Sequence, residues 1–412
     1  MLTLEGKYSS AKIFIERIEQ DAIDQIFKLC NHLISQDSNI AIMPNIHINK
    51  SSTVGITMTI MDKVVPNLVG IDIGCGVRVQ PIKIAKGFDW INEFDKKLRV
   101  TIPSGNKIRN KAHKFIKEVP LCNLKCPVID FASTEFSLGT LGADNHYVEV
   151  SYDELGRYYL TVHSGSRNLS CQITKYYQSI ANEMLKSDNN KKIRATELTL
   201  KKLQSEQSDL ELIGLKQPKR KYIEDLKIDT DLAYLDSTLM DDYLHDMNIV
   251  TEFAYWNRKA IIYDIVKSLK DRVNFAYEEN GYESFDTIHN YIDLETNILR
   301  KGAISANKDE LLIIPLNMRD GSIIAVGKGN ADWNYSAPHG AGRIMNHTMS
   351  KQTLTLSMFK KSMRGIHSTS ICSENINGCC FVYQDIHEII DNIKDTVEIL
   401  RIIKPIYNFK AK

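Results

Sequence analysis

A carboxylate and a thiol lie three residues apart in a stretch of the sequence that is rich in glycine. Asp72 and Cys75 occur in Gly70-Ile71-Asp72-Ile73-Gly74-Cys75-Gly76-Val77-Arg78. The mostly apolar run 64–69 before it predicts the end of a strand. Glycines add little to a core but permit tight turns that expose neighbouring side chains. The stretch therefore predicts a loop that presents two metal ligands and needs partners from distant segments.

Four histidines have similar surroundings, rich in glycine, serine or asparagine. They are His146, His163, His289 and His339. A structural role would be the simpler interpretation for any one of them, but their shared setting favours function. After His163 and His339, short Gly- or Ser-containing turns end in Arg167 and Arg343. Backbone N–H groups and a guanidinium both bind phosphate oxygens, so these two turns predict a phosphate site.

Asp72, Cys75 and three of the histidines would make a metal site of mixed oxygen, nitrogen and sulfur ligands. Imidazole and thiolate suit zinc, manganese, iron or cobalt, and the carboxylate favours a harder ion such as manganese. The Cys75 thiolate could bridge two ions, and two-metal sites commonly serve phosphoryl or nucleotidyl transfer. The residue types alone thus predict a metal-dependent enzyme that acts on phosphates. Cys122 and Cys126 form a CxxxC pair with no second pair nearby, which favours buried thiols over zinc.

Composition restricts the class of protein. The chain has 412 residues, of which 25% are charged, and a net charge of +1, so it lacks a global basic field for nucleic acid. Local basic clusters at 216–221, 360–364 and 404–412 could still form a phosphate-binding face. Eight cysteines are too few for a disulfide scaffold of this size. With no signal peptide and no apolar run near the roughly 20 residues that span a bilayer, we expect a cytoplasmic protein.

Strands and helices must hold these residues in place. Short strands are expected between about Ile40 and Ile82, at 157–162 running into His163, at 311–315 and at 322–327. The region 172–272 predicts mostly helix, with a charged stretch at about 188–226 that indicates an exposed arm or insertion. A last amphipathic helix is expected from Asp385 as N-cap to Leu400. Without a regular βαβ rhythm, the pattern predicts an α+β fold around one central core.

Taken in order, these motifs resemble the RtcB family of RNA ligases over nearly the whole chain. The resemblance rests on many segments: Met43-Pro44, 70–76, 139–149, 163–167, Asn257-Arg258, His289-Asn290, 300–303, 339–343 and Lys410. It implies a single domain over 1–412, with a β-rich core, flanking helices and a helical insertion at about 172–272.

The resemblance also implies a role for each matching residue. Asp72, Cys75, His146, His163 and His289 match the ligands of two manganese ions that share Cys75. His339 matches the nucleophile that takes GMP from GTP as a phosphoramidate. The positions around the guanylate are matched by Asn145, Glu149, Asn290, Tyr383 and Lys410. Arg167 matches an arginine near the RNA phosphate.

By resemblance, the expected activity is GTP- and Mn²⁺-dependent ligation of RNA. A 3′-phosphate or 2′,3′-cyclic phosphate end would be joined to a 5′-hydroxyl end, in tRNA splicing or RNA repair. Two alternatives stay open: a metal-dependent phosphoesterase that has lost nucleotide transfer, and a non-catalytic RNA-binding relative. The sequence also leaves open the natural RNA, the preference for GTP over ATP, the oligomeric state and the need for a helper protein.

Several segments depart from the family's pattern. The usual Met-Pro-Asp-x-His is Met43-Pro44-Asn45-Ile46-His47 here, and the usual Gly-Ser-Met-Gly turn is replaced within 316–321. The segments 333–338 and 377–384 also differ, although Tyr383 is kept, and Asn168 replaces a glycine. These changes spare the expected ligands and His339. They indicate a divergent branch with altered nucleotide or RNA contacts.

Overall fold

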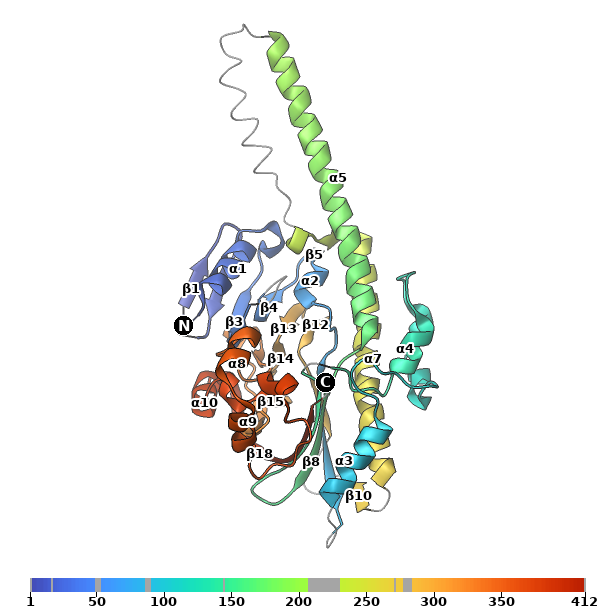
Figure 1. Ribbon diagram of the computed structural model, residues 1–412. Helices are drawn as coiled ribbons and strands as arrows, with labels where there is room; N and C mark the ends of the chain where they lie inside the picture. The colour runs from blue at the N-terminus through green and yellow to red at the C-terminus, as the bar shows by residue number, and fades with distance from the viewer. Residues whose placement is uncertain are drawn as a thin grey trace.

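The computed structural model describes residues 2–15, 18–48, 53–85, 90–143, 145–206, 230–269, 272–276 and 284–410. It confirms the α+β class, with two large and mainly antiparallel sheets beside long helices (Figure 1). The larger sheet contains, in spatial order, β10 (Val273–Phe275), β6 (Gly76–Ile84), β8 (Tyr158–Ser164), β7 (Tyr147–Tyr152), β18 (Val397–Lys410), β16 (Gly321–Gly327) and β15 (Leu311–Asn317), with β11 (Phe285–Ile288) paired to β6.

The second sheet has six strands, of which β2 and β3 run parallel. Its order is β1 (Leu2–Glu5), β2 (Ser10–Ile13), β3 (Ile40–His47), β4 (Val54–Thr59), β13 (Ile298–Lys301) and β12 (Asn290–Asp293). Two small sheets pair β14 (Ala303–Ser305) with β17 (Ser336–Pro338), and β5 (Lys63–Val64) with β9 (Leu235–Asp236).

The helices flank these sheets, as the resemblance implied. They are α1 (Gln20–Cys30), α2 (Pro66–Val69), α3 (Trp90–Thr101), α4 (Phe131–Ser137), α5 (Asn168–Glu206), α7 (Ser237–Leu269), α8 (His347–Thr353), α9 (Leu356–Ser362) and α10 (Ile386–Ile393). None of the described helices combines the length and the apolar character needed to cross a membrane.

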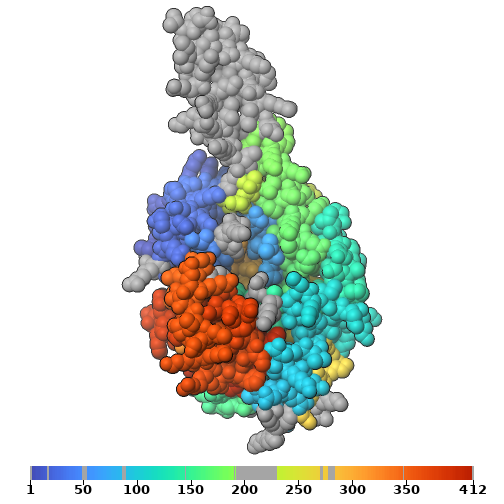
Figure 2. All heavy atoms as spheres, viewed as in Figure 1, coloured from blue at the N-terminus to red at the C-terminus, as the bar shows by residue number. Residues whose placement is uncertain are grey.

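Helix α7 joins the two main cores. Its first half, including Phe253, packs against α5 and belongs to the core that also contains side chains of the six-stranded sheet and of α1. Its second half, including Ile261 and Ile265, packs with α3 against one face of the larger sheet. The opposite face of that sheet is left for the site. On the side shown in Figure 2, the orange C-terminal part of the chain covers much of the surface below the blue N-terminal segment.

Two predictions of local structure were wrong. Residues 66–69 form the one-turn helix α2 instead of a strand end, since Pro66 in its first turn fixes a helical backbone angle. The last helix does begin after Asp385, whose side chain accepts a hydrogen bond from the His387 amide, but it ends at Ile393. Val397 and Leu400 belong to strand β18. They were assigned to the helix because their apolar side chains happen to continue its spacing.

Helix α5 is one 39-residue element that extends far from the body of the molecule (Figure 1). Its outer half covers the first part of the charged stretch that indicated an arm. The rest of that stretch, and the basic cluster at 216–221, lie outside the described residues. That the region is an insertion stays a prediction.

Candidate active site

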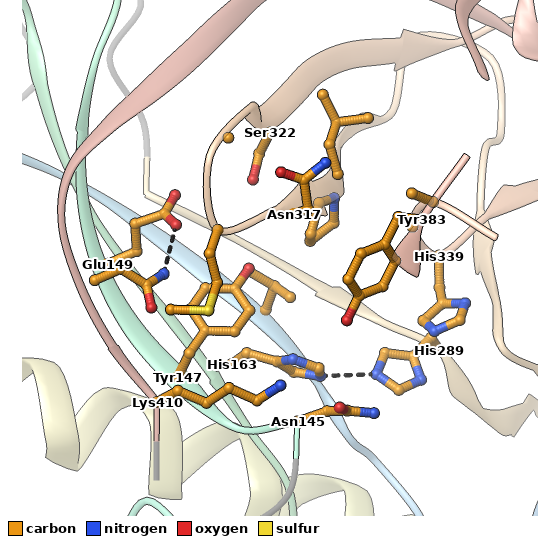
Figure 3. Close-up of a pocket in the computed structure, with 18 residues that line it drawn as sticks. Asn145, Tyr147, Glu149, His163, His289, Asn317, Ser322, His339, Tyr383 and Lys410 are labelled. Atoms are coloured by element: carbon orange, nitrogen blue, oxygen red, sulfur yellow. Dashed lines mark hydrogen bonds between the residues drawn. The ribbon is translucent and has the colours of Figure 1, made fainter. Parts of the chain in front are cut away.

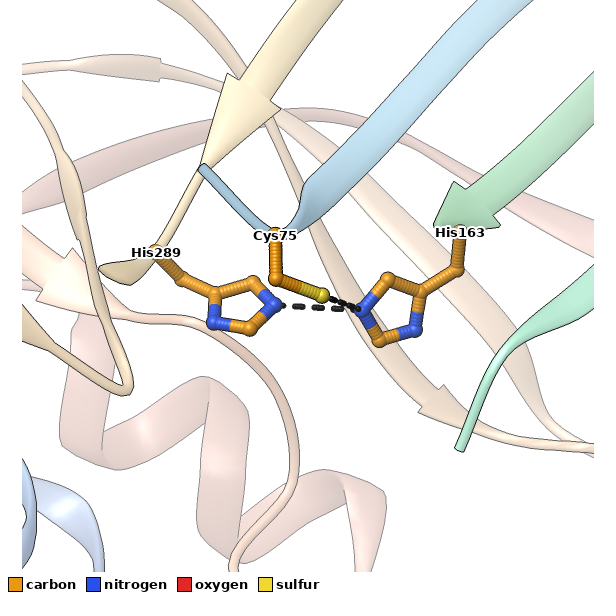
Figure 4. A group of neighbouring side chains, drawn as sticks. All are labelled: Cys75, His163 and His289. Atoms are coloured by element: carbon orange, nitrogen blue, oxygen red, sulfur yellow. Dashed lines mark hydrogen bonds between the residues drawn. The ribbon is translucent and has the colours of Figure 1, made fainter. Parts of the chain in front are cut away.

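Three of the expected metal ligands come from strand ends that the sheet register brings together. Strand β6 pairs with β8 and with β11, so that Gly76 lies opposite both Ser164 and Ile288. Cys75 precedes this point on β6, His163 is paired with Val77, and His289 follows β11 directly. The three side chains consequently converge from three different strands, as Figure 4 shows.

The distances within this group are those of a ligand cluster. Cys75 Sγ lies 3.3 Å from His163 Nε2, which lies 3.1 Å from His289 Nε2. A second group combines Asp72, Cys75 and His146. In that group Cys75 Sγ lies 3.4 Å from His146 Nε2, and Asp72 Oδ2 lies 3.5 Å from the same nitrogen. The two groups share only Cys75, as the bridging arrangement requires.

Two glycines make the close approach of the second group feasible. A Cβ atom at Gly165 would lie 2.3 Å from Asp72 Oδ1. At Gly142, where φ is +90°, a Cβ atom would lie 2.4 Å from His146 Nδ1 and closer still to the Arg167 guanidinium. Any larger residue at either position would displace a ligand. Glycine in these turns therefore leaves room for the ligand side chains to approach one another.

Two buried side chains of α7 hold the loops from behind. Arg258 donates to the carbonyl oxygens of Gly74 and Ser164 at 2.7 and 2.9 Å, and pairs with Asp286. Asn257 accepts from the backbone N–H of Gly139 and donates to the carbonyl of Gly165. Because both residues are fully buried, these contacts are shielded from water. Helix α7 thus fixes the Asp72–Cys75 loop and the His163 turn relative to each other.

Burial keeps His163, His289 and His339 neutral. It lowers the pKa of His289 to about 3, with the charge of His163 adding to the effect. Burial likewise lowers the pKa of His163, and that of His339, well below the usual range. Burial and the neighbouring Asp72 carboxylate raise the pKa of the Cys75 thiol. Neutral imidazoles offer lone pairs to a cation, and a bound cation would reverse the effect on the thiol.

The donor atoms that the structure brings together are of the kinds that bind metal ions. The facing Nε2 atoms of His163 and His289 have one sulfur beside them, and no carboxylate joins this group. Nitrogen with sulfur in one group, and an added carboxylate in the other, suit manganese, iron, cobalt or zinc. Cys122 and Cys126 belong to neither group, and only Cys126 is buried.

His339 lies beside this centre, with its ring centroid 4.7 Å from that of His289. Its Nδ1 lies 2.7 Å from the carbonyl oxygen of Gly302, which can only accept a hydrogen bond. A proton on Nδ1 would pair with this carbonyl and leave Nε2 with a free lone pair, whereas in the other tautomer Nδ1 accepts from Asn45 Nδ2, which lies 2.5 Å away. Asn45 Nδ2 donates to the same carbonyl at 2.9 Å. The residue that replaces the family's aspartate is thus a direct neighbour of His339.

Two adjoining cavities meet at the histidines. The first has a volume of about 120 Å³ and extends from His163, His289 and His339 to a polar end at Glu149 (Figure 3). The second has about 510 Å³ and is lined by both ligand groups together with His47, Lys301 and Arg343. Both are lined by His339. An atom on His339 is therefore within reach of either cavity.

The structure gathers most of the expected nucleotide residues in the first cavity. Asn145, Glu149, Tyr383 and Lys410 line it. Asn290 lines the second cavity, where its amide donates to the Asp72 carbonyl at 3.3 Å. Burial raises the pKa of Glu149 to about 7, although Ser151 and Asn408 donate hydrogen bonds to its carboxylate.

Arg167 takes a position behind the ligands. Its guanidinium donates to Thr140 Oγ1 at 3.0 Å and to the Gly105 carbonyl at 2.9 Å. It lies against Gly142, next to His146, and belongs to the lining of neither cavity. Its contact with RNA phosphate stays a prediction.

Other lining residues were missed from the sequence. Tyr147, Asn317, Ser322 and Asn408 line the first cavity. Tyr147 could have been found, because it lies two positions before Glu149 on strand β7 and so shares its face. Asn408 has the same relationship to Lys410 on β18. Asn317 and Ser322 come from the β15–β16 hairpin, whose position over this sheet no local pattern reveals.

Comparison with known proteins agrees with this site. A sequence model described as "tRNA-splicing ligase RtcB" matches residues 29–124 and 130–411. The chain is 26% identical over 403 residues to "RNA-splicing ligase RtcB" of Escherichia coli K12, with 90% of each chain covered. It is 22% identical to "tRNA-splicing ligase RtcB" of Archaeoglobus fulgidus, covering 87% of this chain and 84% of the relative. Because the family model spans most of the sequence, the chain belongs to the tRNA-splicing ligase RtcB family.

Proposed function

We propose that this protein is a GTP- and manganese-dependent RNA ligase that acts through guanylylated His339. It would join a 3′-phosphate or 2′,3′-cyclic phosphate end to a 5′-hydroxyl end, in tRNA splicing or RNA repair. The position of His339 carries the proposal. This histidine lines both the cavity with a polar end and the larger cavity, which contains the metal-ligand groups together with Lys301 and Arg343. The RNA-ligase names of the relatives support the same activity.

In the first step, Nε2 of His339 would attack the α-phosphorus of GTP. The new bond joins nitrogen to phosphorus, and pyrophosphate leaves with the electron pair of the broken P–O bond. Nε2 would be competent in the tautomer whose ring proton lies on Nδ1 and faces the Gly302 carbonyl, and burial keeps the ring neutral. Asn145, Tyr383 and Lys410 would hold the nucleotide in the first cavity.

In the next steps, an RNA 3′-phosphate in the second cavity would take the guanylyl group. A phosphate oxygen displaces His339 from phosphorus, and the RNA 5′-hydroxyl then attacks the activated 3′-phosphate, releasing GMP. Lys301 and Arg343 line this cavity and can neutralise phosphate charge, and His47, whose pKa is lowered by burial, can donate a hydrogen bond. Manganese ions held by the Cys75–His163–His289 and Asp72–Cys75–His146 groups would lower the charge barrier to these phosphoryl transfers. A cyclic phosphate end would first be opened by water.

Labelling with α-³²P GTP in the presence of Mn²⁺ tests the proposal. We expect a covalent GMP adduct that is labile to acid and absent from His339→Ala. The exposed His387→Ala serves as a matched control and should label normally. Absence of an adduct on the metal-loaded protein would contradict the proposal. The same assay with ATP tests the choice of purine.

A phosphoesterase is the second candidate, favoured by the sizes of the two cavities. The first, at about 120 Å³, is smaller than the roughly 300 Å³ common for ligand sites, whereas the metal-lined cavity has about 510 Å³. Such an enzyme would open 2′,3′-cyclic phosphates without GTP. His339→Ala would leave its rate unchanged, whereas a ligase would lose all joining activity.

A further inference from the structure

A basic and exposed segment lies outside both cavities. Residues 107–117, the basic segment, contain four lysines, one arginine and no acidic residue. All four lysines are exposed to solvent: Lys107, Lys111, Lys114 and Lys117. None of them lines either cavity. The roles proposed above for the two cavities therefore leave this positive charge without a function.

Hydrogen bonds connect the start of the basic segment to the metal site. Just before it, the Gly105 amide donates to the Gly142 carbonyl at 2.6 Å. Within it, Arg109 donates to the Gly139 carbonyl at 2.9 Å. The run from Gly139 to Gly142 leads on to His146, which lines the second cavity. The basic segment consequently begins next to the cavity that is proposed for RNA phosphate.

The far end of the basic segment reaches an outer stripe of helix α7. Its last residues belong to the short helix η2 (Lys114–Glu118), which packs against α7. The α7 stripe consists of Trp256, Lys259, Tyr263 and Lys267, which recur every three or four positions and so share one face. None of the four is buried. The α7 stripe spans roughly 16 Å of helix, enough to contact a few nucleotides.

Lysine ammonium groups lie over aromatic rings where the two elements meet. Lys114 Nζ lies 3.9 Å from the centroid of the Tyr263 ring and 5.1 Å from that of Phe115. Lys259 Nζ lies 4.3 Å from the Trp256 ring. Because Lys114 is exposed, its ammonium can turn from the ring to a phosphate and leave the ring face to a base. Positive charge interleaved with ring faces is the combination that binds single-stranded nucleic acid.

We propose that the basic segment and the α7 stripe bind single-stranded RNA next to the ends that are joined. The inference rests on the proposed function for RNA as the ligand, and it adds a surface outside the reaction centre. Tyr263 would stack on a base, while Lys111 and Lys114 bind neighbouring phosphates. A double helix hides its base faces, so it would use the lysines but not the ring. An acidic protein would likewise use only the lysines.

Fluorescence anisotropy with labelled oligouridylate measures binding to the full-length protein. Lys111→Gln/Lys114→Gln removes two phosphate contacts, so the slope of log affinity against log salt concentration should weaken by about 1.4. Tyr263→Ala should lower the affinity for oligouridylate roughly 5- to 20-fold and leave that for an RNA duplex unchanged. Lys7→Gln/Lys28→Gln, at two exposed positions in the N-terminal part of the chain, is the matched control and should keep the wild-type slope.

Three results would contradict the proposal. A wild-type salt slope in Lys111→Gln/Lys114→Gln would remove the lysines from the RNA surface. Equal losses of affinity for oligouridylate and duplex RNA in Tyr263→Ala would overturn the stacking role of its ring. If polyglutamate bound as tightly as oligouridylate, the surface would fit an acidic protein, and its assignment to RNA would be wrong.

Labelling of His339 with GTP separates this inference from the proposed function. It needs no RNA, so both sets of variants should label as wild type does, which also shows that they fold. If wild type forms the adduct but the variants bind oligouridylate as wild type does, only the RNA-surface proposal fails. If wild type forms no adduct and the variants still lose RNA binding as expected, the ligase proposal fails and the RNA surface stands.

Discussion

The amide nitrogen of Asn45 lies 2.5 Å from Nδ1 of His339, and both groups converge on the carbonyl oxygen of Gly302. The Asn45 Oδ1 atom is buried and unpaired among the described residues. His339 is therefore oriented by a neutral carbonyl and a neutral amide. A carboxylate at position 45 would instead place a negative charge beside the ring.

Asn45→Asp tests this relationship. The carboxylate would accept the Nδ1 proton of His339 and stabilise the charged imidazolium, so the pKa of His339 should rise by about one unit or more. Only the neutral ring can attack. As the pH is lowered, the rate of guanylylation should therefore begin to fall at a higher pH in Asn45→Asp than in wild type. The pH profile of adduct formation measures this shift. The exposed Asn39→Asp should retain the wild-type profile, and an unshifted profile in Asn45→Asp would contradict the prediction.

Cys75 should be needed for both metal sites, because it is the only ligand that the two groups share. We expect Cys75→Ala to lose binding at both sites, whereas His146→Ala and His289→Ala each lose binding at one. Calorimetry and metal analysis with Mn²⁺ measure the number of ions bound. Cys171→Ala is the control, since Cys171 belongs to neither group. Wild-type stoichiometry in Cys75→Ala would show that the sulfur is not a shared ligand.

Glu149 makes stability depend on pH. Its pKa is about 7 in the folded protein, above its ordinary value of 4.5, because the side chain is buried. The folded state thus holds the proton more tightly, and this contribution to stability is complete below pH 4.5 and is lost as the pH rises to about 7. Glu149→Gln should therefore raise the free energy of unfolding at pH 8 by roughly 3 kcal/mol at most, relative to its effect at pH 4.5. Denaturant unfolding at both pH values checks this, and an equal effect at both would refute it.

Arg258 should matter for both stability and metal binding. Arg258→Met leaves the Gly74 and Ser164 carbonyls without their donor and leaves Asp286 with only Arg78, at 3.7 Å. We expect a loss of about 3 kcal/mol in unfolding free energy, as for a broken buried ion pair, and weaker Mn²⁺ binding. Lys12→Met, which breaks an exposed pair with Asp332, should cost less than about 1 kcal/mol. Similar losses of unfolding free energy in Arg258→Met and Lys12→Met would argue against the role of Arg258 in holding the metal loops.

The sequence predicted the members of the site better than their surroundings. Asp72, Cys75, His146, His163 and His289 stood out because ligand side chains are unusual in glycine-rich turns, and the structure brings all five together. The contact of Asn45 with His339 joins residues 294 positions apart, and no local pattern encodes it. The α+β class was predictable from mixed periodicities. Residues 66–69 and 397–400 were assigned wrongly, because a short apolar run is compatible with a buried strand and with a buried helix.

The long helix α5 begins at Asn168, immediately after the turn that carries His163 and Arg167, and α7 returns to hold the same turn through Asn257 and Arg258. Helix α5 therefore begins at the turn that follows His163, and α7 holds this turn from the middle of its length. Helix α5 thus starts at the site and extends far outside the body of the molecule (Figure 1). The outer half of α5 is thus continuous, along a single helix, with the turn that follows the ligand His163, although it extends away from the body of the molecule.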